Sequence, residues 1–167
     1  GQEGGRGGHL DAAAGVWAIT TTDSDDERPS WSTPRRLCDG IMMNKPVVAS
    51  SGRWLIAAAR WRTEGSCVVF GSDDDGASWQ RLGAASVPEE HRSCDEHMLV
   101  ERLDGSQWML VRTTYGIGES TSTDGGHSWS PVQPTALAHP VTRFFIRRLA
   151  STRLLLVKHG PLAKRTE

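Results

Sequence analysis

The sequence predicts an all-β protein, a β-propeller built from four-stranded blades, and three observations lead to this prediction. A box of the form S-x-D-x-G-x-x-W recurs along the 167-residue chain. Paired apolar runs separated by short turn sequences alternate with the boxes, and no long amphipathic helix pattern is visible. Trp is used in excess, with seven Trp against one Tyr and three Phe, which indicates a repeated structural position.

The box occurs in full at residues 72–79 and 122–129, and in a degenerate form at 24–31, where Arg28 replaces the Gly. The copies start at residues 24, 72 and 122, in steps of 48 and 50 residues. Ser and Asp side chains accept hydrogen bonds from turn amides, Gly permits a positive φ, and Trp opens the next strand as an apolar plug. The boxes are therefore interpreted as reinforced hairpin turns and not as catalytic groups.

Three further hairpins lie between the boxes. They cover residues 46–59 with a turn at 51–52, residues 97–111 with Asp104-Gly105, and residues 144–157 with a turn at 151–152. Asp-Gly between apolar runs is the strongest short hairpin signal. Two hairpins per repeat give four strands every ~45–50 residues, which is the spacing of propeller blades.

This spacing predicts a partial propeller over residues 16–160. It divides into a half blade at 16–37, blades at 41–87 and 94–135, and a half blade at 140–160, with a disordered lead-in or cloning remnant at 1–15 and a polar tail at 161–167. Propellers typically have 4 to 8 blades, so about three blade equivalents cannot close a ring alone. A homodimer would make a six-bladed ring and hide the open strand edges, and a fragment of a longer protein is the alternative.

Composition excludes several classes of protein. Nineteen basic and 20 acidic residues give a net charge of −1, which argues against a globally basic nucleic-acid binder. No apolar run approaches the ~20 residues of a membrane span, and no signal sequence is visible. Cys38, Cys67 and Cys94 form an odd set without CxxC, which favours free thiols and a cytoplasmic location. The spacing of His91, Cys94 and His97 matches no standard zinc site, so neither a metal nor a cofactor is predicted.

Strand parity separates the loops onto two rims. The box turns share one rim with the turns between first and second strands, and the remaining connections lie on the other. This second rim is polar and rich in Arg and Lys, which suits a ligand that carries a carboxylate. Trp61 lies beside this rim, where it could stack on a sugar ring.

One segment carries a family resemblance. Residues 95–105 (DEHMLVERLDG) and 108–112 (WMLVR), followed by the box at 122–129, resemble the sialidases of the BNR/Asp-box superfamily. Residues 43–46 (MNKP) and 143–149 (RFFIRRL) resemble the BNR-repeat, sialidase-like bacterial branch. The resemblance covers about residues 16–160.

The resemblance implies a six-bladed propeller that cleaves a terminal acidic sugar. In that family three Arg bind the sialic-acid carboxylate, a Tyr activated by a Glu is the nucleophile, and an Asp is the acid/base. Glu96 matches the activating Glu, Arg112 matches one carboxylate-binding Arg, and Arg143 is a candidate for another. Asp39 and Tyr115 are the available candidates for the acid/base and the nucleophile. The remaining predicted substrate-binding residues are Asn44, Lys45 and His97, and the predicted partner is an acidic carbohydrate.

The sequence also departs from the family pattern. It contains no upstream Arg-Ile-Pro segment for the first Arg and no Tyr near its C-terminal end. The chain by itself is therefore predicted to be an incomplete sialidase. Two alternatives stay open: a non-catalytic propeller that binds carbohydrate or protein, and a uronate-active polysaccharide lyase. In the lyase, Tyr115 with His97 or His159 would transfer the proton.

Overall fold

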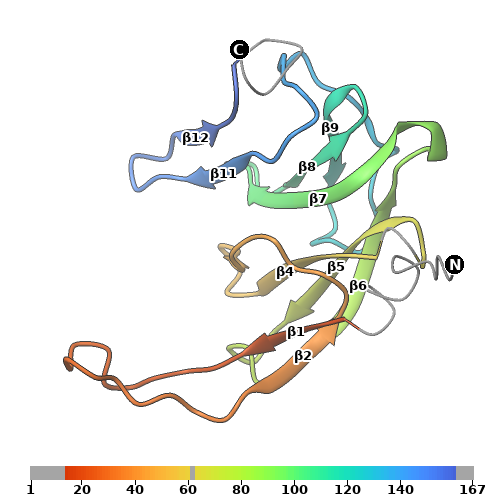
Figure 1. Cartoon of the computed structure of the whole chain (residues 1–167). Coiled ribbons are helices and arrows are strands. Elements are labelled where there is room, and N and C mark those ends of the chain that lie inside the picture. Colours follow the sequence, from red (N-terminus) through yellow and green to blue (C-terminus); the bar gives the residue numbers. More distant parts are fainter. Residues whose placement is uncertain (1–13, 61–62, 161–167) are drawn as a thin grey trace, which may run out of the picture.

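A computed structural model describes residues 14–60 and 63–160, and these parts of the chain are all-β (Figure 1). Apart from a single-turn 3-10 helix, η1 (Glu89–His91), the regular elements of the described ranges are strands. The all-β prediction is therefore confirmed.

The strands form four antiparallel sheets, in each of which the pairing follows chain order. The first four-stranded sheet contains β3 (Val47–Val48), β4 (Trp54–Ala59), β5 (Ser66–Ser72) and β6 (Gln80–Ser86). The second contains β7 (Arg92–Glu101), β8 (Gln107–Thr113), β9 (Gly116–Ser122) and β10 (Gln133–Pro134). Two-stranded sheets flank them: β1 (Gly15–Ala18) with β2 (Arg35–Asp39), and β11 (Phe145–Arg148) with β12 (Leu154–Val157).

Each sheet packs its apolar face on the next sheet along the chain. Because successive strand residues point to opposite faces, Leu55 and Ala57 of β4 face the second four-stranded sheet, whereas Ile56 and Ala58 face β1 and β2. The second sheet packs in turn on β11 and β12 through Met98 and the residues clustered with it. Such stacked four-stranded meanders are consistent with propeller blades. A closed ring would require strands from outside the described residues.

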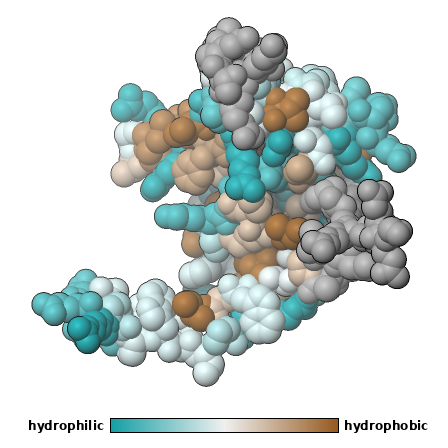
Figure 2. Space-filling view, viewed as in Figure 1, coloured by the Kyte–Doolittle hydropathy of each residue, from teal (hydrophilic) through white to brown (hydrophobic). Residues whose placement is uncertain are grey.

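The two end sheets leave apolar side chains in solvent. On β12, Leu155 is 42% exposed and Val157 is 54% exposed, and on β1 Trp17 is 57% exposed. Figure 2 shows the apolar surface over β11 and β12 at the upper left of the molecule. Each end sheet therefore presents both an unpaired strand edge and apolar surface.

The two full boxes form closely similar turns. In the first, the amide of Gly76 donates to Ser72 Oγ at 2.9 Å, and the amide of Ser78 donates to Asp74 Oδ1 at 2.8 Å. Trp79 then donates its indole N–H to the carbonyl oxygen of Gly76 at 3.0 Å. Residues 122–129 repeat these bonds with similar distances. The interpretation of the full boxes as reinforced turns agrees with this geometry.

The degenerate box has a different alignment from the predicted one. Asp23, and not Asp26, accepts hydrogen bonds from the Ser30 amide at 3.1 Å and the Ser30 hydroxyl at 2.7 Å. Thr21 donates its hydroxyl to Asp23, as Ser72 does to Asp74. The Thr21 and Ser30 bonds hold the pKa of Asp23 at about 2. The alignment on Ser24 was wrong because this turn is three residues longer than the full boxes.

The register confirms the predicted parity of the loops. In the first four-stranded sheet Trp54 pairs with Ser72 and Ala59 pairs with Cys67, so the box turn and the 51–52 turn lie at one end of the sheet. Two contacts between neighbouring sheets join this box rim: the Ser50 amide donates to Glu101 Oε2 at 2.8 Å, and His127 approaches Arg53 at 3.3 Å. The opposite rim carries Asp39 at the end of β2, Glu96 in β7 and Tyr115 in the connection between β8 and β9.

Candidate functional site

The candidate site begins at an irregularity in β7. The β7–β8 register is interrupted on both sides of Asp95, which pairs with Arg112. Asp95 has φ +56° and Glu96 has φ +38°, a left-handed conformation uncommon in residues other than Gly. Such a bulge changes the direction of the side chains along the strand. Asp95 is fully buried, whereas Glu96 lies at the polar rim with a partly exposed carboxylate.

Glu96 joins two arginines at this rim. Arg112 Nη1 donates to Glu96 Oε2 at 2.8 Å, and Arg143 Nε donates to Glu96 Oε1 at 3.0 Å. Arg112 Nη2 also donates to the carbonyl oxygen of Val141 at 3.1 Å. The side chain of Arg112 is 15% exposed and that of Arg143 is 67% exposed. The structure therefore brings together the three residues that the resemblance grouped, with Arg112 held firmly and Arg143 open to solvent.

Tyr115 and Asp39, the candidate nucleophile and acid/base, lie in surroundings that differ from those of Glu96. Tyr115 packs edge-to-face on His91, with 5.1 Å between ring centroids, and burial raises the pKa of its hydroxyl. Asp39 pairs with Arg36 at 2.5 Å and with Arg60 at 3.0 Å. The hydrogen bond from Arg36 holds the Asp39 pKa below its usual value, which is unfavourable for a general acid. Neither residue is hydrogen-bonded to Glu96 in the described part of the chain.

The remaining predicted ligand contacts divide into buried and exposed groups. His97 is 2% exposed, its Nε2 lies 2.8 Å from the Val68 carbonyl oxygen, and burial lowers its pKa to about 4. It links two sheets as a neutral ring and does not reach the rim, contrary to its predicted role. Asn44 Nδ2 donates to the His97 carbonyl oxygen at 2.9 Å, and Lys45 is exposed beside it. Trp61 lies outside the described residues.

The lyase alternative paired Tyr115 with His97 or His159. His97 is buried on the Val68 carbonyl oxygen, so it does not pair with Tyr115, whose ring contacts His91 instead. The ring of His159 lies beside that of His139, with 6.4 Å between their centroids. Within residues 14–60 and 63–160, no group of three His, Cys, Asp or Glu side chains is placed to hold a metal ion.

Asp95 directly precedes Glu96 in the sequence but does not share its place at the polar rim. Both carboxylate oxygens of Asp95 are buried and have no hydrogen-bond partner among the described residues. Burial raises the Asp95 pKa to about 6, and the charge of Arg92 opposes the shift. The buried run that begins at His97 gave only a partial signal for this burial, because the register break at Asp95 interrupts the alternation of faces.

Comparison with known proteins supports the architecture. Residues 9–167 match the BNR repeat-like domain family. A protein of unknown function from Dyadobacter fermentans superposes with a TM-score of 0.68 at 20% identity, over 84% of this chain and 43% of that one. The NanB sialidase of Streptococcus pneumoniae superposes with a TM-score of 0.61 at 26% identity, over 75% of this chain and 20% of that one. A leech intramolecular trans-sialidase, solved with 2,7-anhydro-Neu5Ac, superposes with a TM-score of 0.59 at 26% identity, over 74% of this chain and 20% of that one.

The chain thus spans less than half the length of each of these solved proteins. No curated protein matches the sequence. Among the described residues no helix is long and apolar enough to cross a membrane. Since the family model matches nearly the whole chain and sialidases share its stacked sheets, the chain belongs to the BNR repeat-like domain family and is sialidase-like.

Proposed function

We propose that this chain provides the carboxylate-binding side of a site for an acidic sugar within a sialidase-like propeller. The observation that carries the proposal is the Arg112 guanidinium, which Glu96 and the Val141 carbonyl oxygen hold at the polar rim. A guanidinium held in one orientation can pair with a ligand carboxylate through two parallel hydrogen bonds. Two arginines against one glutamate leave a net positive charge at the rim, which favours an anion.

Arg143 extends this site. Its Nε is bonded to Glu96, whereas its terminal nitrogens make no hydrogen bond with the described residues. Most of its side chain is in solvent, so it can pair with a ligand carboxylate without giving up a second protein contact. Glu96 therefore positions both arginines, and its own carboxylate is occupied by them.

Hydrolysis by this chain alone is not part of the proposal. A retaining glycosidase needs a nucleophile and an acid on either side of the bond that it cleaves. Tyr115 lies against His91 and Asp39 lies between Arg36 and Arg60, so neither completes that pair with Glu96. A catalytic nucleophile and acid would have to come from blades outside the described residues.

A second copy of the chain is our proposed source of the strands that close the ring. The end sheets contain strands one and two (β11 and β12) and strands three and four (β1 and β2) of the predicted blade pattern. Pairing the β12 edge of one copy with the β1 edge of another would complete a four-stranded blade and close a six-bladed ring. Further blades in a longer polypeptide would complete the ring in the same way, and a measurement of molecular mass separates the two sources.

The test is calorimetric titration of the chain with N-acetylneuraminic acid. Arg112→Ala is expected to lower the affinity at least tenfold because the held guanidinium is lost, about the contribution of one charge-assisted hydrogen-bonded pair. Arg153→Ala is the matched control, since Arg153 lies on the exposed turn between β11 and β12. Absence of saturable binding by the unmodified chain would contradict the proposal.

Two enzymatic assays separate the alternatives. Release of 4-methylumbelliferone from its sialoside, lost in Glu96→Gln, would assign hydrolysis to the assembled ring. Absorbance from unsaturated uronate would assign the lyase reaction. Binding of the acidic sugar without either signal is the result that we expect for this chain.

A further inference from the structure

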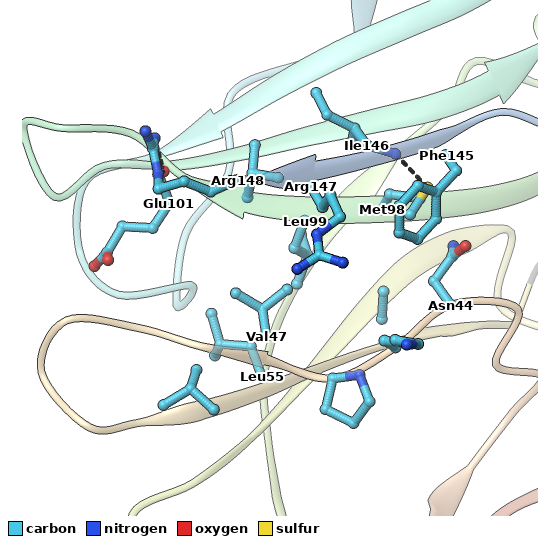
Figure 3. Close-up of a pocket in the computed structure, with 15 residues that line it drawn as sticks. Asn44, Val47, Leu55, Met98, Leu99, Glu101, Phe145, Ile146, Arg147 and Arg148 are labelled. Atoms are coloured by element: carbon cyan, nitrogen blue, oxygen red, sulfur yellow. Dashed lines mark hydrogen bonds between the residues drawn. The ribbon is translucent and has the colours of Figure 1, made fainter. Parts of the chain in front are cut away.

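A second candidate site lies beside the first, in a groove between the first strands of three neighbouring sheets. The groove has a volume of about 300 Å³, and residues of β3, β7 and β11 line it, together with residues of β4 and of the connection before β3. Figure 3 shows Arg147 extending from β11 into the groove, above Val47 and Leu55 at its floor. The floor is apolar because Val47, Leu55 and Leu99 belong to the core between the two four-stranded sheets.

The charged side chains that line the groove differ in how many hydrogen bonds they make with the protein. Arg148 is engaged by backbone, since its Nε donates to the Glu101 carbonyl oxygen at 3.1 Å and its Nη1 to the Thr152 carbonyl oxygen at 2.5 Å. The Glu101 carboxylate accepts from the amide and hydroxyl of Ser50. Arg147 and Lys45, in contrast, are exposed and make no ion pair or hydrogen bond with the rest of the described chain. The groove therefore offers two free cations over an apolar floor.

The groove lies next to the cluster of Glu96, Arg112 and Arg143 along β7 and β11, although none of these three residues lines it. Met98 lines it two residues after Glu96, and Phe145 lines it two residues after Arg143. The amide of Ile146 approaches Met98 Sδ at 3.4 Å, so β7 and β11 are in contact there. Two residues of a strand span roughly 7 Å, and the groove wall from Phe145 to Arg148 spans roughly 10 Å. A ligand held by its carboxylate at Arg112 could therefore extend into the groove.

We propose that this groove binds the second unit of an oligosaccharide in which successive sugars are acidic. This inference rests on the proposed function, because the first unit is placed at Arg112. The apolar floor suits the carbon-bound hydrogens of a sugar ring, and the amide of Asn44 lies at the junction between the two sites. Arg147 and Lys45 match a second carboxylate, since unpaired cations over an apolar surface favour an anion that also has an apolar face.

The experiment compares one acidic sugar with two. The chain is titrated with N-acetylneuraminic acid, with its α2,8-linked disaccharide, and with N,N′-diacetylchitobiose as an uncharged disaccharide. We expect the acidic disaccharide to bind about tenfold more tightly than the monosaccharide, about the contribution of one charge-assisted contact, and the uncharged disaccharide to gain nothing. Arg147→Ala should remove the gain and leave the monosaccharide affinity unchanged, while Arg153→Ala should change neither.

Each outcome decides a separate question. If the monosaccharide binds through Arg112 but the acidic disaccharide shows no gain, the groove proposal is wrong and the proposed function stands. If the gain disappears in Arg147→Ala but survives in Arg112→Ala, the groove is an independent anion site and the proposed function is wrong. If neither sugar binds, both are wrong. Lys45→Ala repeats the test on another element should Arg147→Ala fail to fold by circular dichroism.

Discussion

Arg112 forms its ion pair with Glu96, at 2.8 Å, although the residue opposite it in the β7–β8 register is Asp95. The two consecutive left-handed residues of the bulge produce this exchange. The Asp95 side chain is turned into the core, without a hydrogen-bond partner among the described residues, and the Glu96 side chain is directed to the rim between two arginines. A single backbone feature thus forms both the candidate site and a buried titratable group.

The Glu96–Arg112 pair should contribute measurably to stability. Both side chains are mostly buried, so screening by water is weaker than for a surface pair. We expect Glu96→Gln and Arg112→Ala each to lower the free energy of unfolding by about 1–3 kcal/mol, and a double-mutant cycle to give a coupling of about 1 kcal/mol or more. Urea unfolding measures both. The exposed pair Arg53–Asp73 is the control, and an equal coupling there would contradict the special role of the rim pair.

Asp95 and His97 should have opposite effects on the pH dependence of stability. The Asp95 pKa is raised to about 6, so the folded chain binds this proton more tightly than the unfolded chain, and stability falls as the pH rises from about 4 to 6. The His97 pKa is lowered to about 4, so the unfolded chain binds that proton more tightly, and stability rises between about pH 4 and 6.5. The two contributions nearly cancel, so we expect the unmodified chain to show only a shallow rise across this range, to which the lowered pKa of the buried His139 contributes.

Asp95→Asn should make the free energy of unfolding depend clearly on pH. The variant keeps the shape of the side chain but removes its titration, so the rise in stability due to His97 is no longer opposed. We expect the free energy of unfolding of the variant to exceed that of the unmodified chain by about 2–3 kcal/mol at pH 7 and to equal it near pH 4. Urea unfolding at pH 4, 5, 6 and 7 tests this. Parallel curves for the two proteins would show that Asp95 does not titrate in this range.

The sequence predicted the parts of the fold that depend on local turn chemistry. The full boxes and the Asp104-Gly105 turn could be located because their Ser, Asp and Gly side chains satisfy the turn themselves. The degenerate box was misaligned because an insertion moved Asp23 out of the spacing on which the motif depends. The full boxes keep that spacing and were therefore aligned correctly.

The candidate site was predictable only in part. The resemblance grouped Glu96 with Arg112 and Arg143, and the structure places them in contact. The burial of Asp95 could not be predicted from alternation alone, because the bulge changes which face follows it. The direction of Tyr115 depends on its packing against His91, from a connection more than twenty residues earlier, and no local pattern encodes that contact.

The buried serine of each full box should contribute more to stability than an ordinary turn residue does. Ser72 is 2% exposed, accepts from the Gly76 amide and donates to Asp74. Ser72→Ala and Ser122→Ala leave that buried amide without a partner, and each should lower the free energy of unfolding by about 1–2 kcal/mol. Ser151→Ala, on an exposed turn without a box, should change it by less than about 0.5 kcal/mol. Equal effects at all three sites would contradict the reinforcing role.

The open edge of β12 should mediate association with a second copy. Unpaired strand edges with apolar surface favour pairing with another chain, and the described end sheets supply complementary halves of a blade. We expect light scattering at micromolar concentration to give twice the 18.2 kDa mass of the chain, and Val157→Asp to return it to a monomer. Val48→Asp is the matched control, since Val48 is 56% exposed against 54% for Val157 but lies on β3 of a four-stranded sheet and not on the β12 edge. A monomeric mass for the unmodified chain would contradict the second copy and leave further blades of a longer polypeptide as the source of the ring.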